Sequence, residues 1–261
     1  MRTFLANSIR ARRLLKPSAT RPDIRLQPIY VLPNHEISLA KPGGVHIRYS
    51  LSQALHFIFE PAHIFTGDIM QKHIQNYVGK LTHALGLDAM LQISVLAESL
   101  LKAWRAGRSI YICGNGGSAG NAIHLANDFI YGAGLKNGGG LRVEALSANS
   151  AVITCLANDL GYDSIFSEQI RIKGNPDDLL IVLSGSGNST NVVKAIETAN
   201  KLRMKTFAIL GFTGGRCKEL VQYPIHFEID DMQIAEDLQL IVGHVCMQWL
   251  YNQVDLSSDL L

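Results

Sequence analysis

The feature that most constrains the fold is a set of short, unbroken apolar runs separated by stretches of helical periodicity. The runs lie at residues 109–113, 143–146, 179–183, 206–210 and 225–229. Unbroken runs of this length are typical of strands covered on both faces, and such strands form parallel sheets with helices above and below. The sequence therefore predicts an α/β fold, a three-layer αβα domain with a five-stranded parallel sheet.

Helical periodicity flanks this predicted sheet at both ends. Apolar residues recur at three- and four-residue spacing through residues 70–107, and Gly86 interrupts the pattern. This predicts two N-terminal helices, which we expect to pack on the sheet. An amphipathic helix is predicted at residues 234–253. Residues 70–253 thus form the predicted domain, and residues 254–261 form a C-terminal tail.

The composition permits a large core and indicates a compartment. Of the 261 residues, 47% are hydrophobic, which is enough to bury a core without disulfides. The four cysteines form no CxxC pair, which favours free thiols in a reducing compartment, so we expect a cytoplasmic protein. The longest apolar runs have the length of strands, and no membrane association is expected.

Residues 1–65 differ in composition from the rest of the chain. They hold nine of the 24 Lys and Arg residues, three of the 22 acids and six of the eight prolines. Three interpretations fit this segment: an organelle transit peptide, a basic disordered arm, or translated sequence upstream of a true start at Met70. We expect a poorly ordered or non-native extension. The remaining residues carry 15 bases and 19 acids, which argues against a nucleic-acid-binding core.

Two Gly/Ser-rich loops each follow a predicted strand and precede a predicted helix. The first loop, residues 114–118, reads GNGGS, and the second loop, residues 184–189, reads SGSGNS. The carboxyl ends of parallel strands meet at one edge of a sheet, where backbone N–H groups, hydroxyls and helix N-termini bind phosphate. Neither loop contains the lysine of a nucleotide P-loop, and no GxGxxG follows the first strand. The loops therefore predict a phosphate site that is neither a nucleotide P-loop nor a dinucleotide-binding loop.

These two loops, at this separation, resemble those of SIS (sugar isomerase) proteins, and most closely the phosphoheptose isomerases. Residues 157–159 (AND) and 209–215 (ILGFTGG) reinforce the resemblance, which covers about residues 70–253. It implies the SIS fold and conversion of sedoheptulose 7-phosphate to D-glycero-D-manno-heptose 7-phosphate, for the heptose of surface polysaccharides. It also implies a homotetramer in which neighbouring subunits complete each site.

Carried over residue by residue, the resemblance implies a set of substrate contacts. The phosphate ligands would be Ser118, Ser184, Ser186 and Ser189, with Asn115 near the sugar hydroxyls. The predicted substrate-binding set further contains Gly116, Gly117, Asn158 and Asp159.

Aldose–ketose isomerisation moves a proton between adjacent carbons through an enediol, which requires a base and an acid. His124 and Asp128 lie four residues apart on one predicted helix, and Glu236, Asp237 and His244 lie on the last one. The resemblance implies that His124, Asp128, Glu236 and His244 can hold zinc. It also implies Asp128 as general base and His244 as general acid, with Glu236 as the alternative base. Here Asp and Glu replace the Glu and Gln that are usual in the family.

Two other functions are compatible with the same loops. One is a non-catalytic SIS module that binds a phosphosugar or serves as a replication-initiator adaptor. The other is an isomerase of a different phosphosugar. The presence of both His124 and His244 favours an enzyme.

Overall fold

The computed structural model describes residues 29–31, 36–40, 46–134 and 139–253, with side chains described from Gly67 onward. The chain divides into two compact units, Met1–Gln71 and Lys72–Leu261. The predicted extension at 1–65 lies partly outside the described residues, and the predicted tail at 254–261 lies wholly outside them.

The first unit contains a small antiparallel sheet and the start of a long helix. The sheet has the order β1-β2-β3 and is formed by β1 (Ile29–Val31), β2 (Glu36–Ala40) and β3 (His46–Ser50). Helix α1 (Leu51–Leu85) begins in this unit and ends in the second one.

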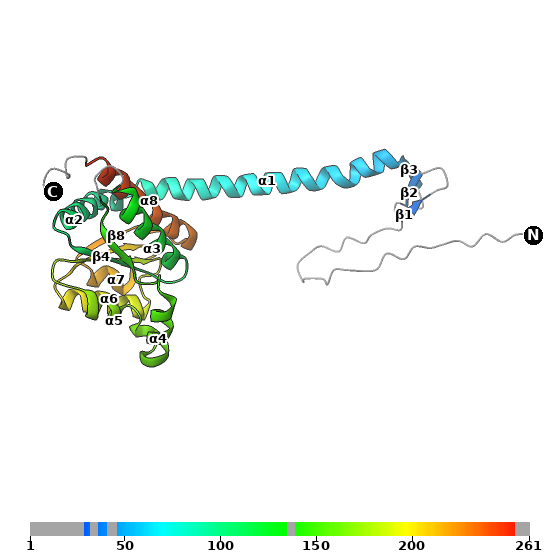
Figure 1. The fold of residues 1–261 in the computed structure, drawn as a ribbon. Helices are drawn as coiled ribbons and strands as arrows, with labels where there is room; N and C mark the ends of the chain where they lie inside the picture. Colours follow the sequence, from blue (N-terminus) through cyan, green and yellow to red (C-terminus); the bar gives the residue numbers. More distant parts are fainter. Residues whose placement is uncertain (1–28, 32–35, 41–45, 135–138, 254–261) are drawn as a thin grey trace, which may run out of the picture. The chain divides into compact units, whose positions relative to one another are not determined.

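The second unit contains the predicted five-stranded parallel sheet (Figure 1). All of its strands run parallel, in the order β5-β4-β6-β7-β8. The strands are β4 (Ser109–Cys113), β5 (Arg142–Ala145), β6 (Leu179–Ser184), β7 (Lys205–Leu210) and β8 (Tyr223–His226). This confirms the predicted fold class, and each strand overlaps the apolar run that predicted it.

Helices connect and cover these strands. The helices are α2 (Ile93–Arg105), α3 (Gly117–Asn127), α4 (Ser150–Leu160), α5 (Ser167–Lys173), α6 (Thr190–Lys201), α7 (Gly215–Leu220) and α8 (Met232–Tyr251). Three short helical segments complete the order: η1 (Asp88–Gln92), the π-helical η2 (Asp128–Gly132) and η3 (Tyr162–Ser164). The predicted break at Gly86 is confirmed, because α1 ends at Leu85.

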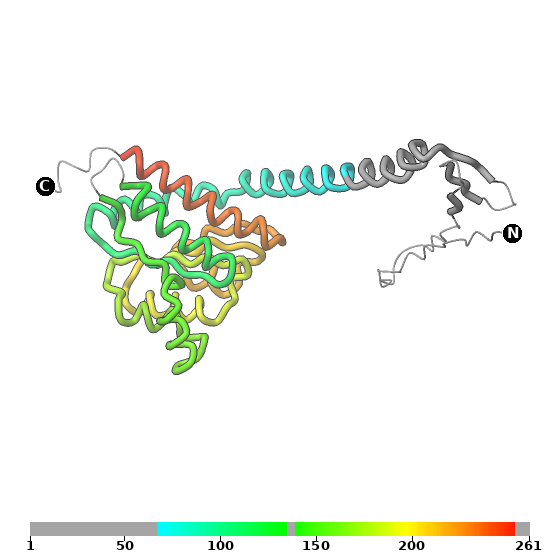
Figure 2. The backbone as a smooth tube through the Cα atoms, turned by 45° about the vertical axis from the view of Figure 1, so that its right-hand side comes forward, coloured from blue at the N-terminus to red at the C-terminus, as the bar shows by residue number. Residues whose placement is uncertain are grey.

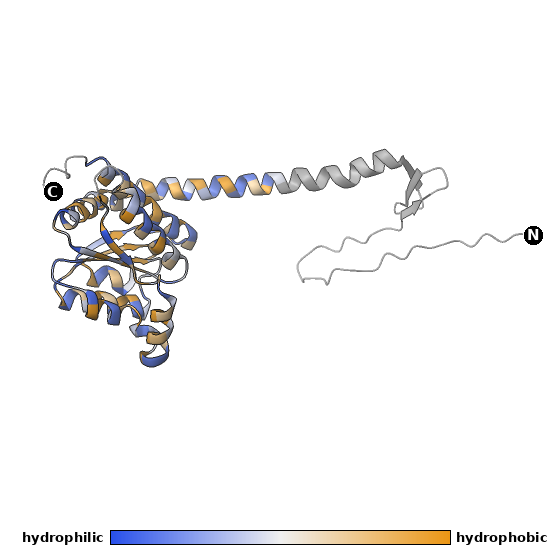
Figure 3. Ribbon diagram, in the orientation of Figure 1, coloured by the Kyte–Doolittle hydropathy of each residue, from blue (hydrophilic) through white to orange (hydrophobic). Residues whose placement is uncertain are grey.

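The sheet separates two apolar cores, because alternate residues of each strand point to opposite faces. In β4, Ile110 and Ile112 face the core shared with α2, α3 and α8, whereas Tyr111 and Cys113 face the core shared with α5 and α6. The strands are mostly hydrophobic along their length (Figure 3), since both of their faces are covered. Each fully buried Leu, Ile or Phe contributes about 1.5–3 kcal/mol.

Helix α8 lies on the first of these faces and packs against both α2 and α3 (Figure 2). Its first turn is capped by Asp231, whose carboxylate accepts a hydrogen bond from the backbone N–H of Ile234. Because α3 begins directly after β4, this packing brings α8 to the carboxyl edge of the sheet.

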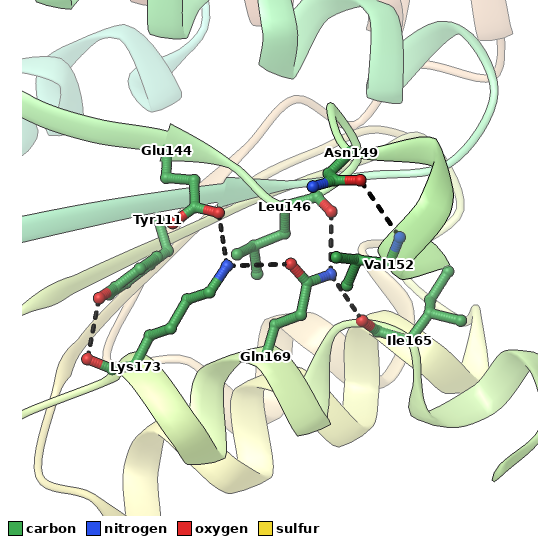
Figure 4. Close-up of polar contacts among 8 residues, drawn as sticks. All are labelled: Tyr111, Glu144, Leu146, Asn149, Val152, Ile165, Gln169 and Lys173. Carbon is green, nitrogen blue, oxygen red and sulfur yellow. Dashed lines mark hydrogen bonds and ion pairs between the residues drawn. The ribbon is translucent and has the colours of Figure 1, made fainter. Parts of the chain in front are cut away.

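A polar cluster holds α5 against the other face of the sheet (Figure 4). The buried amide of Gln169 donates to the carbonyl oxygens of Leu146 and Ile165, at 2.9 and 2.8 Å. Lys173 forms a 2.5 Å ion pair with Glu144 of β5, and its carbonyl oxygen accepts a hydrogen bond from the hydroxyl of Tyr111. These contacts satisfy the buried polar groups, so the α5 side of the fold carries a structural network.

Within the described part of the chain, no single helix is both long and apolar enough to span a membrane. One pair of helical segments, Gly67–Leu85 and Asp88–Arg105, passes that test when taken together, with a 52° bend between them. In α2, the apolar face is buried in the core.

Candidate active site

The two Gly/Ser loops meet in one pocket at the carboxyl edge of the sheet. The pocket has a volume of about 300 Å³. The first loop contributes Asn115, Gly116, Gly117 and Ser118, the second contributes Ser184, Gly185, Ser186 and Ser189, and Leu183, Met232 and Glu236 complete the lining. The structure therefore brings together the two loops that the sequence places about 70 residues apart.

Glycines allow the loops to approach this closely. A Cβ atom on Gly114 would lie 2.7 Å from the carbonyl oxygen of Leu183 and 2.8 Å from the Cβ of Ser118. Gly187 has a positive φ of 68°, and a Cβ there would lie 2.0 Å from the carbonyl oxygen of Gly214. A side chain at either position would push the backbones apart, so these glycines set the spacing between the loops and their neighbours.

The hydroxyl of Ser118 is positioned by a buried amide of α8. Gln239, which is fully buried, donates to the Oγ of Ser118 at 3.0 Å and accepts from the amide of Asn121 at 3.0 Å. A hydroxyl that accepts from Gln239 keeps its own hydrogen for another partner. Ser118 can therefore donate into the pocket.

The serines of the second loop are positioned by local backbone bonds. The Oγ of Ser184 accepts from the backbone N–H of Gly187 at 3.0 Å, and the Oγ of Ser186 accepts from that of Asn188 at 3.4 Å. Ser189 is the N-cap residue of α6, but its side chain makes no capping hydrogen bond. All three hydroxyls thus retain a hydrogen that can be donated to a ligand oxygen.

The pocket attracts anions without a cationic side chain. No Lys or Arg is among the described residues that line it. Helices α3 and α6 begin at the two loops, and each helix N-terminus carries a partial positive charge and unpaired N–H groups. The attraction for an anion in the pocket therefore comes from two helix N-termini and a set of hydroxyl donors.

Glu236 brings a carboxylate from α8 into the same pocket. Its Oε1 lies 2.3 Å from the place that a Cβ atom of Gly117 would occupy. Among the described residues, the carboxylate of Glu236 has no hydrogen-bond or ion-pair partner, so it is available to a ligand.

A second group of side chains, which could hold a metal ion, is formed by His124 of α3, Asp128 of η2 and His244 of α8. The Nε2 atoms of His124 and His244 are 3.0 Å apart, and Asp128 Oδ2 lies 3.5 and 3.4 Å from them. Ligands at zinc–nitrogen bond lengths and the tetrahedral angle are separated by about 3.3 Å. The three atoms thus approximate one face of a zinc tetrahedron. Glu236, the fourth predicted ligand, is not in this group but lines the pocket.

Two predicted substrate contacts are not brought to the pocket. Asn158 and Asp159 lie near the exposed end of α4 and do not line it. The amide of Asn158 donates to the carboxylate of Asp159, and Cys155 donates to the same carboxylate. Their polar groups thus contact one another.

Asp237, the other acid of the predicted set on α8, binds α1 instead of the metal group. The hydroxyl of Tyr77 donates to Asp237 at 2.5 Å, and this bond, with burial and nearby carboxylates, raises the pKa of Tyr77 to about 12. Lys80 of α1 lies 2.8 Å from Asp231, and this hydrogen bond lowers the pKa of the Asp231 carboxyl. Helix α1 is therefore tied to the start of α8.

Sequence reasoning missed four residues that support the site. Gln239 and Asn121 orient Ser118, and Asn191 and Tyr162 orient Asn115. Gln239 is a polar residue within the apolar stripe of α8, and a polar residue in such a stripe indicates a buried hydrogen-bonding role. For Tyr162, which has an exposed side chain, no sequence pattern gives that signal.

Residues 74–211 match the SIS domain family. The phosphoheptose isomerase of Akkermansia muciniphila is 33% identical over 187 residues, which cover 71% of this chain and 98% of that protein. The Helicobacter pylori phosphoheptose isomerase is 36% identical over 179 residues, with coverages of 68% and 92%. The solved structure of phosphoheptose isomerase GmhA from Neisseria gonorrhoeae superposes with a TM-score of 0.63 at 26% identity, covering 69% of this chain and 98% of that one.

These relatives match over nearly their whole length, and the SIS domain match at residues 74–211 contains both loops and the strands β4 to β7. The resemblance that the loops indicated is confirmed. The chain belongs to the SIS domain family, among the phosphoheptose isomerases.

Proposed function

We propose that this protein is a sugar-phosphate isomerase that converts sedoheptulose 7-phosphate to D-glycero-D-manno-heptose 7-phosphate through an enediol, for the heptose of surface polysaccharides. The observation that carries the proposal is the single pocket lined by both serine loops and by the carboxylate of Glu236. Its family membership supports the same activity.

The phosphate group binds between the two loops. Ser118, Ser184, Ser186 and Ser189 donate their hydroxyl hydrogens to its oxygens, and the N-termini of α3 and α6 stabilise its charge. The sugar chain then extends from the loops toward α8. Binding the phosphate fixes the sugar's reacting carbons in one place, which lowers the entropic cost of proton transfer.

His124, Asp128 and His244 would hold a zinc ion, since two imidazoles and a carboxylate at these distances match the donors that zinc prefers. When bound, the ion supplies Lewis-acid polarisation of a substrate oxygen. Three protein ligands leave a position for that oxygen, as is usual in catalytic zinc sites.

Proton transfer between C1 and C2 of the sugar needs a general base and a general acid. We assign Asp128 as the base through its second carboxylate oxygen and His244 as the acid through Nδ1, because Oδ2 of Asp128 and Nε2 of His244 are the atoms that would hold zinc. Glu236 is the competing base, because its carboxylate lines the pocket and has no partner among the described residues.

We also propose a cytoplasmic homotetramer with shared sites. Apolar side chains exposed on the second unit support an interface: Ile74 and Val78 of α1 are 45% and 54% exposed, and Val245 and Trp249 of α8 are 44% and 37% exposed. Surfaces of this kind commonly lie in contacts between subunits.

The function is tested by assaying the full chain with sedoheptulose 7-phosphate in the presence of zinc. We expect turnover by the wild type and a loss of at least about 100-fold in kcat for the double variant Asp128→Asn, His244→Ala. The matched control is Asp88→Asn, His83→Ala, which makes the same changes at exposed positions outside the pocket and should retain activity. Binding of the phosphosugar without turnover would instead identify a non-catalytic module.

The single variants Asp128→Asn and Glu236→Gln distinguish the two bases. The assignment to Asp128 requires the larger loss of kcat in Asp128→Asn, with zinc content measured in both proteins. A larger loss in Glu236→Gln at unchanged zinc content transfers the role to Glu236.

A further inference from the structure

The side chain of Asn115 makes three hydrogen bonds with residues outside the first loop, one as donor and two as acceptor. Its Nδ2 donates to the Oδ1 of Asn191 at 2.8 Å, and its Oδ1 accepts from the Nδ2 of Asn191 at 2.8 Å. The hydroxyl of Tyr162 donates to the same Oδ1 at 3.0 Å. Asn191 belongs to α6 and Tyr162 to η3, so this cluster joins the elements after β4, β5 and β6.

A backbone donor sets the direction of the whole cluster. The backbone N–H of Val192 donates to the Oδ1 of Asn191 at 2.9 Å, and Asn191 is only 2% exposed. A backbone N–H can only donate, so the Asn191 oxygen must face it. The reciprocal amide pair then leaves Asn115 one orientation, with its oxygen toward Asn191 and Tyr162.

Counting donors and acceptors shows what Asn115 can still offer. An amide oxygen has two lone pairs, and both are taken, one by Asn191 and one by Tyr162. An amide nitrogen has two hydrogens, and one of them is donated to Asn191. Because Asn115 lines the pocket, its second N–H is the group that a ligand can meet.

The backbone around Tyr162 is fixed by its neighbours, which keeps the phenol within reach of Asn115. Its side chain is 56% exposed, but the residues that follow it, Ile165 and Phe166, are each only 1% exposed and belong to the second core. An ion pair between Asp163 and Lys194 of α6, at 3.6 Å, also links η3 to α6. The backbone of η3 is thus fixed while the phenol reaches back to the pocket.

We propose that Tyr162 is a positioning residue for substrate binding. Its hydroxyl donates to the lone pair of the Asn115 oxygen that Asn191 does not use. Asn115 then presents only an N–H donor to an oxygen of the sugar chain. The inference rests on the proposed function, because it assigns the sugar end of the same pocket. It concerns the sugar and not the phosphate, which the serine hydroxyls bind.

The test compares the binding of two ligands to the full chain by calorimetry. For Tyr162→Phe we expect the Kd of sedoheptulose 7-phosphate to rise about three- to tenfold, the worth of one hydrogen bond, while the Kd of inorganic phosphate stays unchanged. In turnover assays, KM should rise by the same factor and kcat should change by less than about twofold. The matched control is Tyr111→Phe, which removes the 2.9 Å bond to the Lys173 carbonyl oxygen away from the pocket and should change neither Kd.

A second variant tests whether Tyr162 acts through Asn115. Asn115→Ala should weaken sedoheptulose 7-phosphate binding, and adding Tyr162→Phe to it should cause no further loss, because residues that act through one another are not additive. Additive losses would overturn the inference. So would an equal rise in both Kd values for Tyr162→Phe, which indicates a general collapse of the loops.

The wild-type measurement separates this inference from the proposed function. If the wild type binds sedoheptulose 7-phosphate no more tightly than phosphate, the proposed function fails and the inference falls with it. If the wild type prefers the sugar phosphate and Tyr162→Phe retains the full preference, only the inference about Tyr162 is wrong.

Discussion

At the scale of single residues, the site depends on Gly117 as much as on its serines. The carboxylate of Glu236 occupies the space beside this glycine, and any side chain there would have to displace it. We expect Gly117→Ala to lower kcat at least about tenfold, because the displaced Glu236 carboxylate would shift the bound sugar within the pocket, and such a misplacement costs rate steeply. Thermal unfolding should change little, since the displaced group is the end of a flexible side chain. Full activity in Gly117→Ala would show that the position of Glu236 does not matter to the reaction.

Tyr77 gives a prediction about pH. Its hydrogen bond to Asp237 raises its pKa from 10.0 to about 12. A raised pKa favours the protonated phenol in the folded state, so the bond's contribution to stability is fully present below pH 10 and is lost as the pH rises through 12. We expect Tyr77→Phe to lower the Tm by about 2–4 °C near neutral pH, and the difference from wild type to vanish between these two pH values. Thermal unfolding of both proteins across this range measures it, and a constant difference would contradict the prediction.

At the scale of elements, the strands and the loops after them were predictable and the connections were not. Unbroken apolar runs predict strands because each strand is covered on both faces, and the run at 109–113 matches β4 residue for residue. The loops after β4 and β6 must share an edge once the sheet is parallel. The start of α1 at Leu51 was not predicted, because the periodic pattern begins near Met70.

The position of Asn158 and Asp159 outside the pocket lining has a physical reason as well. Asn158 and Asp159 were carried over from a motif, whereas α4 has no buried side chain. Its partly buried Ile153, Leu156 and Ala157 pack against the second core, so Asn158 and Asp159 lie on the exposed side of α4. Tyr162, only three residues after Asp159, is the one from this region that reaches Asn115. In the same way, the separation of Glu236 from the His124, Asp128 and His244 group depends on side-chain directions that spacing along α8 does not determine.

At the scale of the whole molecule, different parts of the sheet in the second unit serve stability and substrate binding. The strand interiors serve only the two cores, while the chemistry lies on loops and helix ends at the carboxyl edge, as is general for open parallel sheets. The polar network of Gln169 and Lys173 (Figure 4) supports the fold on the α5 side, away from the pocket. Substitutions of Gln169 or Lys173 should lower the free energy of unfolding without changing which substrate the pocket binds.

The absence of Lys and Arg from the pocket lining has a kinetic consequence. Sites that carry cations draw phosphorylated molecules in from a distance, and that steering weakens as dissolved ions screen it. Helix ends and hydroxyls act only over a few ångströms, and the Glu236 carboxylate does not attract an anion, so long-range attraction should contribute little to the encounter. We expect kcat/KM to change less than about threefold when ionic strength is raised from about 0.01 to 1 M, a range over which the screening length falls from about 30 to 3 Å. Steady-state kinetics at several salt concentrations would measure this, and a steep decline would reveal a charge that reaches the substrate from elsewhere.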